Sequence, residues 1–162
     1  MIASIIATFF YVGYLRPAPG TWGSVVALPL AYIIHIYGGF IALASMTLFI
    51  AMIGWWAIAT ATKGKSKKDY PEFIIDEVTG QWLALWSLSW AATFYSIDIL
   101  SLWPSWIIAF LMFRIFDIFK PGPIGWADKR RDALGVMLDD ILAGVAAGVA
   151  TTVFTILYYI LT

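Results

Sequence analysis

The sequence predicts an all-α, polytopic membrane protein with about five membrane-embedded helices and a short interfacial helix at the N-terminus. Hydrophobic residues make up 62% of the 162 residues and charged residues only 12%, whereas soluble domains are about 45–50% apolar and about 25% charged. The mean hydropathy is +0.86. A chain of this length cannot bury so much apolar surface in a water-soluble fold, so lipid must cover the excess. The net charge of zero provides no basic face for nucleic acid.

The N-terminal segment 1–13 is apolar, but it is too short for a span of about 20 residues. It also lacks the basic flank of a cleavable signal peptide. We therefore expect an interfacial or half-inserted helix there, as part of one integral membrane domain over residues 1–162.

Five later segments are apolar enough to lie in the bilayer, namely 24–36, 40–62, 73–96, 103–119 and 133–161. The first is short and contains Pro29, so a re-entrant helix and a full crossing both remain open. The last is longer than a span needs, which indicates a tilted helix or one that projects from the membrane.

The basic residues predict the orientation of these segments. With five crossings, all ten Lys and Arg residues fall on one side, while the opposite connections around 38–39 and 97–102 contain none. The positive-inside rule makes the basic side cytoplasmic, with the N-terminus inside and the C-terminus outside. The lysine-rich run 63–68 serves topology first and can also attract anionic lipid headgroups.

Acidic residues cluster at the predicted cytoplasmic ends of three helices. They are Asp76, Glu77, Asp117, Asp139 and Asp140. Carboxylates at membrane depth are costly and indicate function. If the three helices pack together, these groups converge and repel one another unless a cation lies between them. Oxygen ligands of this kind suit Mg²⁺.

Simpler roles for these acids remain open. Asp76 and Glu77 can stabilise the start of a helix through capping and the helix dipole. Asp117 can pair with Arg114 or Lys120, which lie three residues away on the same helix face.

Phosphate-binding groups accompany the acidic cluster. Arg114 lies inside an apolar run close to Lys120, and guanidinium groups bind phosphate bidentately. The segment 16–24 begins with Arg16 and forms a proline-glycine turn before a helix, which Thr21 or Ser24 can cap. The amides at that helix start can hold an anion. A divalent metal beside phosphate-binding groups at the membrane surface favours a phosphorylated amphiphile as ligand.

Four stretches carry a resemblance to a known family, namely GYLRPAPGTWGS (13–24), IDEVTGQW (75–82), FRIFDIFKPGPI (113–124) and GVMLDDILAG (135–144). In this combination and order the chain resembles phosphatidylglycerophosphatase A. The resemblance implies a Mg²⁺-dependent enzyme of the bacterial cytoplasmic membrane. Such an enzyme hydrolyses phosphatidylglycerophosphate in the cytoplasmic leaflet to phosphatidylglycerol and phosphate, a step in phospholipid synthesis.

The resemblance also implies roles for individual residues. The acidic catalytic set would be Asp76, Glu77, Asp117, Asp139 and Asp140. The metal ligands would come from Asp76, Glu77, Asp139 and Asp140. The phosphate-binding set would be Arg16, Arg114 and Lys120, with Thr21 added from the turn, while Asp128 is a weak further candidate. The nucleophile stays open between a water activated by a carboxylate, with Glu77 favoured, and an aspartate that is itself phosphorylated.

Competing functions are a phosphatidyltransferase acting on CDP-linked lipids and a small cation transporter or channel. The sequence lacks the Asp-Gly-x-x-Ala-Arg motif that is typical of such phosphatidyltransferases. A transporter or channel predicts acidic residues spread through the bilayer, whereas only Asp98 lies near the other face. The absence of cysteine and the single His35 exclude phosphatases that use a cysteine or a histidine pair. Gly144 and Gly148 form a small-residue face that favours close helix packing, including that of a homo-oligomer.

Overall fold

The computed structural model describes residues 1–161, and every regular element within them is helical. The elements are α1 (Ile2–Ala7), η1 (Val12–Tyr14), α2 (Pro19–Ala61), α3 (Ile75–Ala84), α4 (Trp86–Tyr95), η2 (Ile99–Leu102), α5 (Trp103–Phe119), α6 (Pro123–Asp128) and α7 (Ala133–Leu161). This confirms the predicted all-α class. The short helix α1 falls within the N-terminal segment where an interfacial helix is expected.

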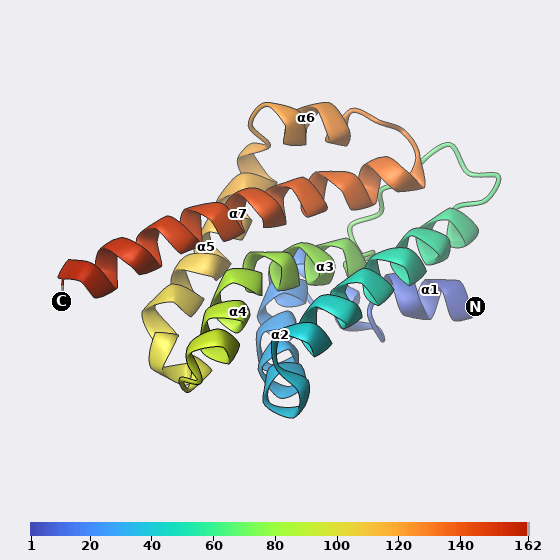
Figure 1. The fold of residues 1–162 in the computed structure, drawn as a ribbon. Helices are drawn as coiled ribbons and strands as arrows, with labels where there is room; N and C mark the ends of the chain where they lie inside the picture. The colour runs from blue at the N-terminus through green and yellow to red at the C-terminus, as the bar shows by residue number, and fades with distance from the viewer. Residues whose placement is uncertain (162) are drawn as a thin grey trace.

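Helix α2 consists of two arms that meet at Gly39 (Figure 1). Gly39 has φ 60° and ψ −154°, a conformation that side chains disfavour. The bend frees the amide of Phe40, which donates to the Thr93 hydroxyl at 3.0 Å. The two arms correspond to the predicted segments 24–36 and 40–62. The first arm starts earlier than predicted, at Pro19, because proline is well suited to the first turn of a helix.

The predicted segment 73–96 is two short helices rather than one. Helices α3 and α4 have 10 residues each and meet at Leu85. The Leu85 amide donates to the Trp82 carbonyl at 3.1 Å, which is the tighter turn of a 3₁₀ helix. Two indole groups fix the pair to α2, since Trp82 donates to the Ala27 carbonyl at 2.8 Å and Trp86 to the Thr47 hydroxyl at 3.1 Å.

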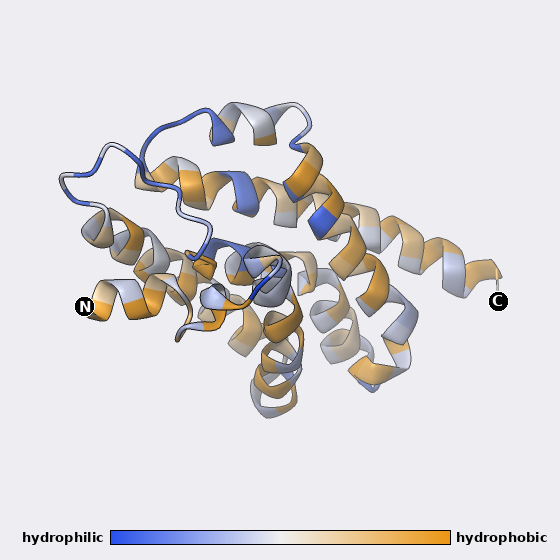
Figure 2. Ribbon diagram, turned by 180° about the vertical axis from the view of Figure 1, so that it is seen from behind, coloured by the Kyte–Doolittle hydropathy of each residue, from blue (hydrophilic) through white to orange (hydrophobic). Residues whose placement is uncertain are grey.

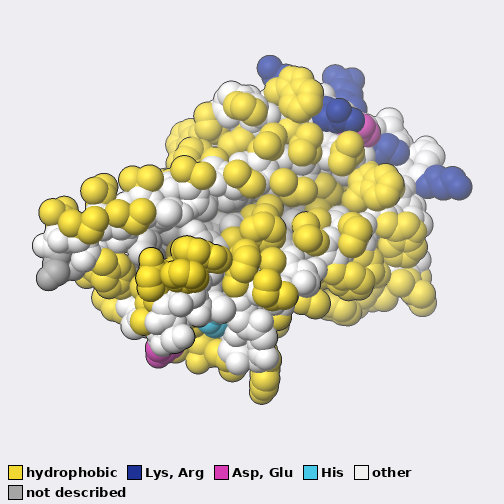
Figure 3. Space-filling view, in the orientation of Figure 1, with side chains coloured by type: hydrophobic (Ala, Val, Ile, Leu, Met, Phe, Trp, Pro, Cys, Tyr) yellow, Lys and Arg dark blue, Asp and Glu magenta, His cyan; other side chains and the backbone are white. Residues whose placement is uncertain are grey.

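The surface of the molecule fits a bilayer. Among the described residues, α2, the stretch Ile99–Phe119 and α7 are long and apolar enough to cross a membrane. Many large apolar side chains on these helices are exposed, among them Phe49, Leu111 and Val149. Figure 3 shows apolar side chains over most of one face, with Lys and Arg gathered at one end. The chain is therefore a membrane protein.

The contact between α3 and α7 depends on two glycines. A Cβ atom built on Gly144 would lie 2.3 Å from the backbone oxygen of Gly80. A Cβ atom on Gly80 would lie 2.6 Å from the backbone oxygen of Asp140. A Cβ atom on Gly148 would lie 3.3 Å from the backbone oxygen of Leu83, also on α3. The small-residue face is thus used inside the chain, and a homo-oligomer would need another face.

We expect Gly144→Ala to lower the free energy of unfolding by about 1–3 kcal/mol, because the added methyl group forces two backbones apart. Thermal unfolding in detergent measures this loss. Gly148→Ala is the matched control, since it has the same gain in helix propensity but a neighbour 1.0 Å further away (3.3 against 2.3 Å). Equal stability of the two variants would contradict the close contact.

Candidate metal and phosphate site

Three helices bring charged side chains together at the end of the molecule where the hydrophilic residues gather (Figure 2). The first turn of α3 supplies Asp76 and Glu77, α5 supplies Arg114 and Asp117, and α7 supplies Asp139 and Asp140. The start of α3 is fixed because the Ile74 amide donates to the Ala7 carbonyl at 2.9 Å. The glycine contact between α3 and α7 then places Asp140 opposite the start of α3.

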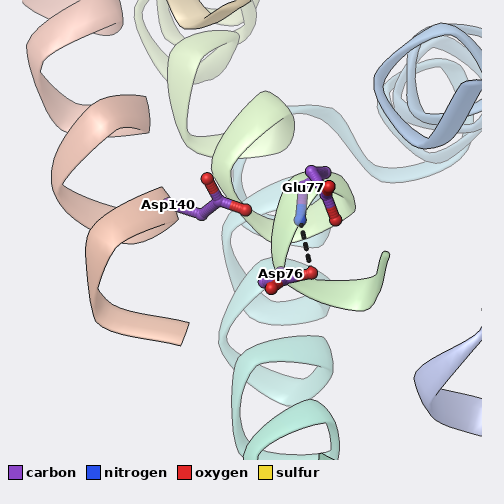
Figure 4. Close-up of side chains that lie close together, drawn as sticks. All are labelled: Asp76, Glu77 and Asp140. Carbon is purple, nitrogen blue, oxygen red and sulfur yellow. Dashed lines mark hydrogen bonds between the residues drawn. The ribbon is translucent and has the colours of Figure 1, made fainter. Parts of the chain in front are cut away.

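Asp76, Glu77 and Asp140 form a tight carboxylate trio (Figure 4), in which one oxygen of each lies within 4.8 Å of the others. Asp76 and Asp140 are 6% and 3% exposed. Asp76 accepts a hydrogen bond from the Glu77 amide at 3.1 Å, so it also stabilises the start of α3. That role does not explain Asp140, which comes from another helix.

The trio has the chemistry of a site for a hard divalent cation. Glu77 Oε2 and Asp140 Oδ1 are buried and have no hydrogen-bond partner among the described residues. Buried anionic oxygens side by side repel one another and need a counter-charge. Three carboxylates with two unpartnered oxygens therefore fit Mg²⁺, which takes oxygen ligands and keeps some of its waters.

Asp139 lies outside this trio, although it was grouped with it as a predicted metal ligand. Its Oδ2 accepts a hydrogen bond from Lys120 Nζ at 2.6 Å. The two aspartates diverge because neighbouring residues point about 100° apart around a helix. Asp139 still lines the same cavity as the trio.

Lys120, a predicted phosphate-binding residue, is engaged by two carboxylates. Its ammonium group pairs with Asp128 as well as with Asp139. Burial alone would lower the pKa of Lys120, but the hydrogen bonds to Asp128 and Asp139 raise it above its ordinary value. Lys120 is thus a fixed positive charge beside the trio.

Arg114 joins the trio to the start of α2. Its Nη1 lies 2.7 Å from Asp117 Oδ2 and 3.5 Å from the Ser24 hydroxyl, so the pairing of Asp117 with Arg114 is confirmed. A Cβ atom on Gly20 would lie 2.2 Å from Glu77 Oε1 and 3.3 Å from Arg114 Nη1. The absence of a side chain at Gly20 therefore lets the helix start approach both groups, and first-turn amides have no partner within their own helix.

The other two phosphate candidates differ in their placement. Thr21 is half-buried in the first turn of α2, next to Gly20. Arg16 is exposed in the turn before that helix. Like Arg114, neither Thr21 nor Arg16 is among the residues that line the cavity at the trio.

The trio opens into a cavity of about 130 Å³, which has room for a phosphate group or a few waters but not for a whole lipid. Its wall contains residues that the sequence did not single out, namely Asp69, Tyr70 and Arg130, together with the weak candidate Asp128. Asp69, Tyr70 and Arg130 come from the loops before α3 and α7, where no hydropathy period indicates a direction, and Asp128 ends α6.

Gln81 is a further polar residue that sequence reasoning missed. Both of its amide atoms are buried without a hydrogen-bond partner in the described part of the chain. It lies four residues after Glu77, on the same face of α3. Its position could have indicated a role, because the only glutamine of the sequence lies in an apolar run one helical turn after Asp76 and Glu77.

The remaining polar candidates have structural roles. His35 Nδ1 lies 2.8 Å from the Ser89 hydroxyl, which joins α2 to α4. Asp98 caps η2 by accepting a hydrogen bond from the Leu100 amide at 3.0 Å. Neither lines the cavity at the trio.

Comparison with known proteins gives consistent matches. A family model described as phosphatidylglycerophosphatase A matches residues 5–155. Two proteins named phosphatidylglycerophosphatase A are 32% identical to the chain and cover 87% of it. They come from Haemophilus influenzae (146 residues, 81% of the relative) and Escherichia coli (147 residues, 76% of the relative).

A third relative, from Bacteroides thetaiotaomicron, is named as a candidate phosphatidylinositol-3-phosphatase. It is 31% identical over 147 residues, which are 87% of the chain and 86% of the relative. No solved structure shows significant similarity to the chain.

Proposed function

The chain belongs to the phosphatidylglycerophosphatase A family, and from this membership we propose a Mg²⁺-dependent lipid phosphatase. In this proposal it hydrolyses phosphatidylglycerophosphate to phosphatidylglycerol and phosphate. The observation that carries the proposal is the buried trio of Asp76, Glu77 and Asp140 within 4.8 Å, next to the guanidinium of Arg114. Mg²⁺ would offset the negative charge of the trio, and the Arg114 guanidinium beside it can hold a phosphate oxygen.

The proposed roles follow from these positions. Asp76, Glu77 and Asp140 would hold Mg²⁺, which when bound supplies positive charge for the phosphate oxygens. Arg114 and the first amides of α2 bind the remaining oxygens of the phosphate. Asp117 holds the Arg114 guanidinium in place, and Lys120 does the same for Asp139.

For the chemical step we propose direct attack by water. A water oxygen forms a bond to phosphorus while the bond from phosphorus to the glycerol oxygen breaks. The water proton passes to a carboxylate, for which Glu77 is our choice, on the oxygen that would not hold the metal. The glycerol oxygen takes up a proton from solvent and leaves as the hydroxyl of the lipid product.

The proposed setting is the cytoplasmic leaflet of a bacterial inner membrane. The support is the one-sided distribution of Lys and Arg (Figure 3), which by the positive-inside rule belongs to the cytoplasmic face. The lipid tail stays in the bilayer, because the cavity of about 130 Å³ admits only the phosphate end of the headgroup.

A second candidate substrate is phosphatidylinositol 3-phosphate. The Bacteroides relative, whose name carries that activity, covers as much of the chain as the other two do. Both lipids present a phosphomonoester, so the carboxylate trio serves either. Family membership favours both phosphatase activities over the phosphatidyltransferase and the cation channel.

The decisive assay is phosphate release by the purified protein in detergent. We expect release from phosphatidylglycerophosphate with Mg²⁺, loss of release on chelation, and recovery when Mg²⁺ is restored. Phosphatidylinositol 3-phosphate tests the second substrate in parallel. Release that persists after chelation would contradict the metal site, and hydrolysis of the inositol lipid alone would contradict the proposed headgroup.

A further inference from the structure

A second hollow, which we call the basic cleft, opens beside the cavity at the trio. Its volume is about 390 Å³, and its charged lining residues are Lys67, Lys68, Asp69, Asp128, Arg130 and Arg131. Asp69, Asp128 and Arg130 line both hollows. The two hollows are therefore neighbours that share part of their walls.

The charges of the basic cleft do not cancel. Arg130 is paired with Asp132 at 2.8 Å, and Asp128 is paired with Lys120. This leaves the cations Lys67, Lys68 and Arg131 against the single anion Asp69. The basic cleft therefore carries an excess of positive charge beside a cavity whose own walls are mostly acidic.

The donors of the cleft are available to a ligand. Lys68 Nζ donates to the Thr62 carbonyl at 2.8 Å, which leaves two of its three N–H groups. Lys67 lies over the Tyr70 ring at 5.3 Å, and this ring belongs to the wall of the cavity at the trio. Arg131 is exposed, and its planar guanidinium presents five donors in a geometry that matches phosphate.

Topology alone does not explain this grouping. Lys63 and Lys129 lie in the same two loops and serve the same positive-inside asymmetry, yet neither lines the cleft. The cleft residues instead face one another from the loop before α3 and the loop before α7. Cations brought together in this way repel one another, and an anion between them relieves the repulsion.

We propose that the basic cleft is a second phosphate-binding site, next to the cavity at the trio. This rests on the proposed function, in which a substrate with two phosphate groups loses one of them. The phosphate in the cleft is either the inorganic phosphate leaving for water or the phosphodiester of the lipid headgroup. Both sources have the same chemistry, and the wall of the cavity at the trio is mostly acidic, whereas the basic cleft has an excess of cations.

The test compares two double variants of the full chain with equal charge loss. Lys67→Gln with Arg131→Gln removes cations from the cleft, and Lys63→Gln with Lys129→Gln removes them from the same loops outside it. We expect the first pair to weaken phosphate binding about 10-fold, as judged by calorimetry with inorganic phosphate and by product inhibition. The second pair should change each value less than about 2-fold.

Kinetics with two lipids identify the source of the phosphate. If the cleft takes the released phosphate, the inhibition constant of phosphate rises and the KM of phosphatidylglycerophosphate stays near that of the control pair. If it takes the phosphodiester, the KM of phosphatidylglycerophosphate rises but that of phosphatidic acid, which has only a phosphomonoester, does not. Equal effects of both pairs, or no effect of either, would overturn the proposal.

Calorimetry separates this proposal from the proposed function, because it needs no turnover. A wild-type protein that binds phosphate through Lys67 and Arg131 but hydrolyses neither lipid would contradict the function and leave the cleft intact. All four substituted side chains belong to loops, and equal thermal midpoints of the two double variants check that they fold alike.

Discussion

Asp140→Asn should lower kcat by about 10³-fold while making the metal-free protein more resistant to thermal unfolding. The two effects have opposite directions for one reason. Asp140 Oδ1 is buried without a hydrogen-bond partner, and the residue shares its site with Asp76 and Glu77. Removing one negative charge relieves repulsion when no metal is present, but it also removes a ligand that turnover requires. Phosphate release and thermal unfolding, each with and without Mg²⁺, measure the two effects.

Asp139→Asn is the matched comparison for Asp140→Asn, because it removes the neighbouring carboxylate. The neighbouring carboxylate pairs with Lys120 at 2.6 Å, so its loss leaves Lys120 with Asp128 alone. We expect Asp139→Asn to lower the thermal midpoint of the metal-free protein, whereas Asp140→Asn raises it. The rise in midpoint that Mg²⁺ produces should survive in Asp139→Asn and disappear in Asp140→Asn. An Asp140→Asn enzyme with normal turnover and normal stabilisation by Mg²⁺ would remove Asp140 from the metal site.

The second large effect is expected from Arg114→Gln, which should raise the KM for phosphatidylglycerophosphate about 10–100-fold. The guanidinium lies between Asp117, the Ser24 hydroxyl and the open approach at Gly20. Glutamine keeps part of the length and the polarity but loses the charge and the paired donors that phosphate requires. Initial rates over a range of lipid concentrations in mixed micelles give KM and kcat separately.

A double-variant cycle with Asp117→Asn decides how Arg114 acts. If Arg114 only neutralises Asp117, which lines the cavity at the trio, then Asp117→Asn added to Arg114→Gln should restore KM. If Arg114 contacts the phosphate, KM stays high in the double variant. We expect the second result, and a restored KM would limit Arg114 to an ion pair with Asp117.

Much of the fold follows from local properties of the sequence. Runs of apolar residues near the length of a bilayer crossing predicted the helical segments, because hydrophobic length is a property of each segment alone. The predicted break at 38–39 is confirmed by Gly39, whose positive φ only glycine adopts at little cost. The prediction of one continuous helix over 73–96 was wrong. The break at Leu85 could not be predicted, because the apolar residues around it include no glycine or proline.

The sequence by itself determined the fold class and the acidic residues at the ends of three helices, because hydropathy and residue type do not depend on distant neighbours. Only the tertiary structure decided that Asp140 faces Asp76 and Glu77 while Asp139 turns to Lys120. The rotation of α7 about its axis is set by the contact of Gly144 with Gly80, and residues so far apart in the chain carry no local signal of their pairing. For the same reason, only the folded chain brings the loops of the basic cleft against the trio.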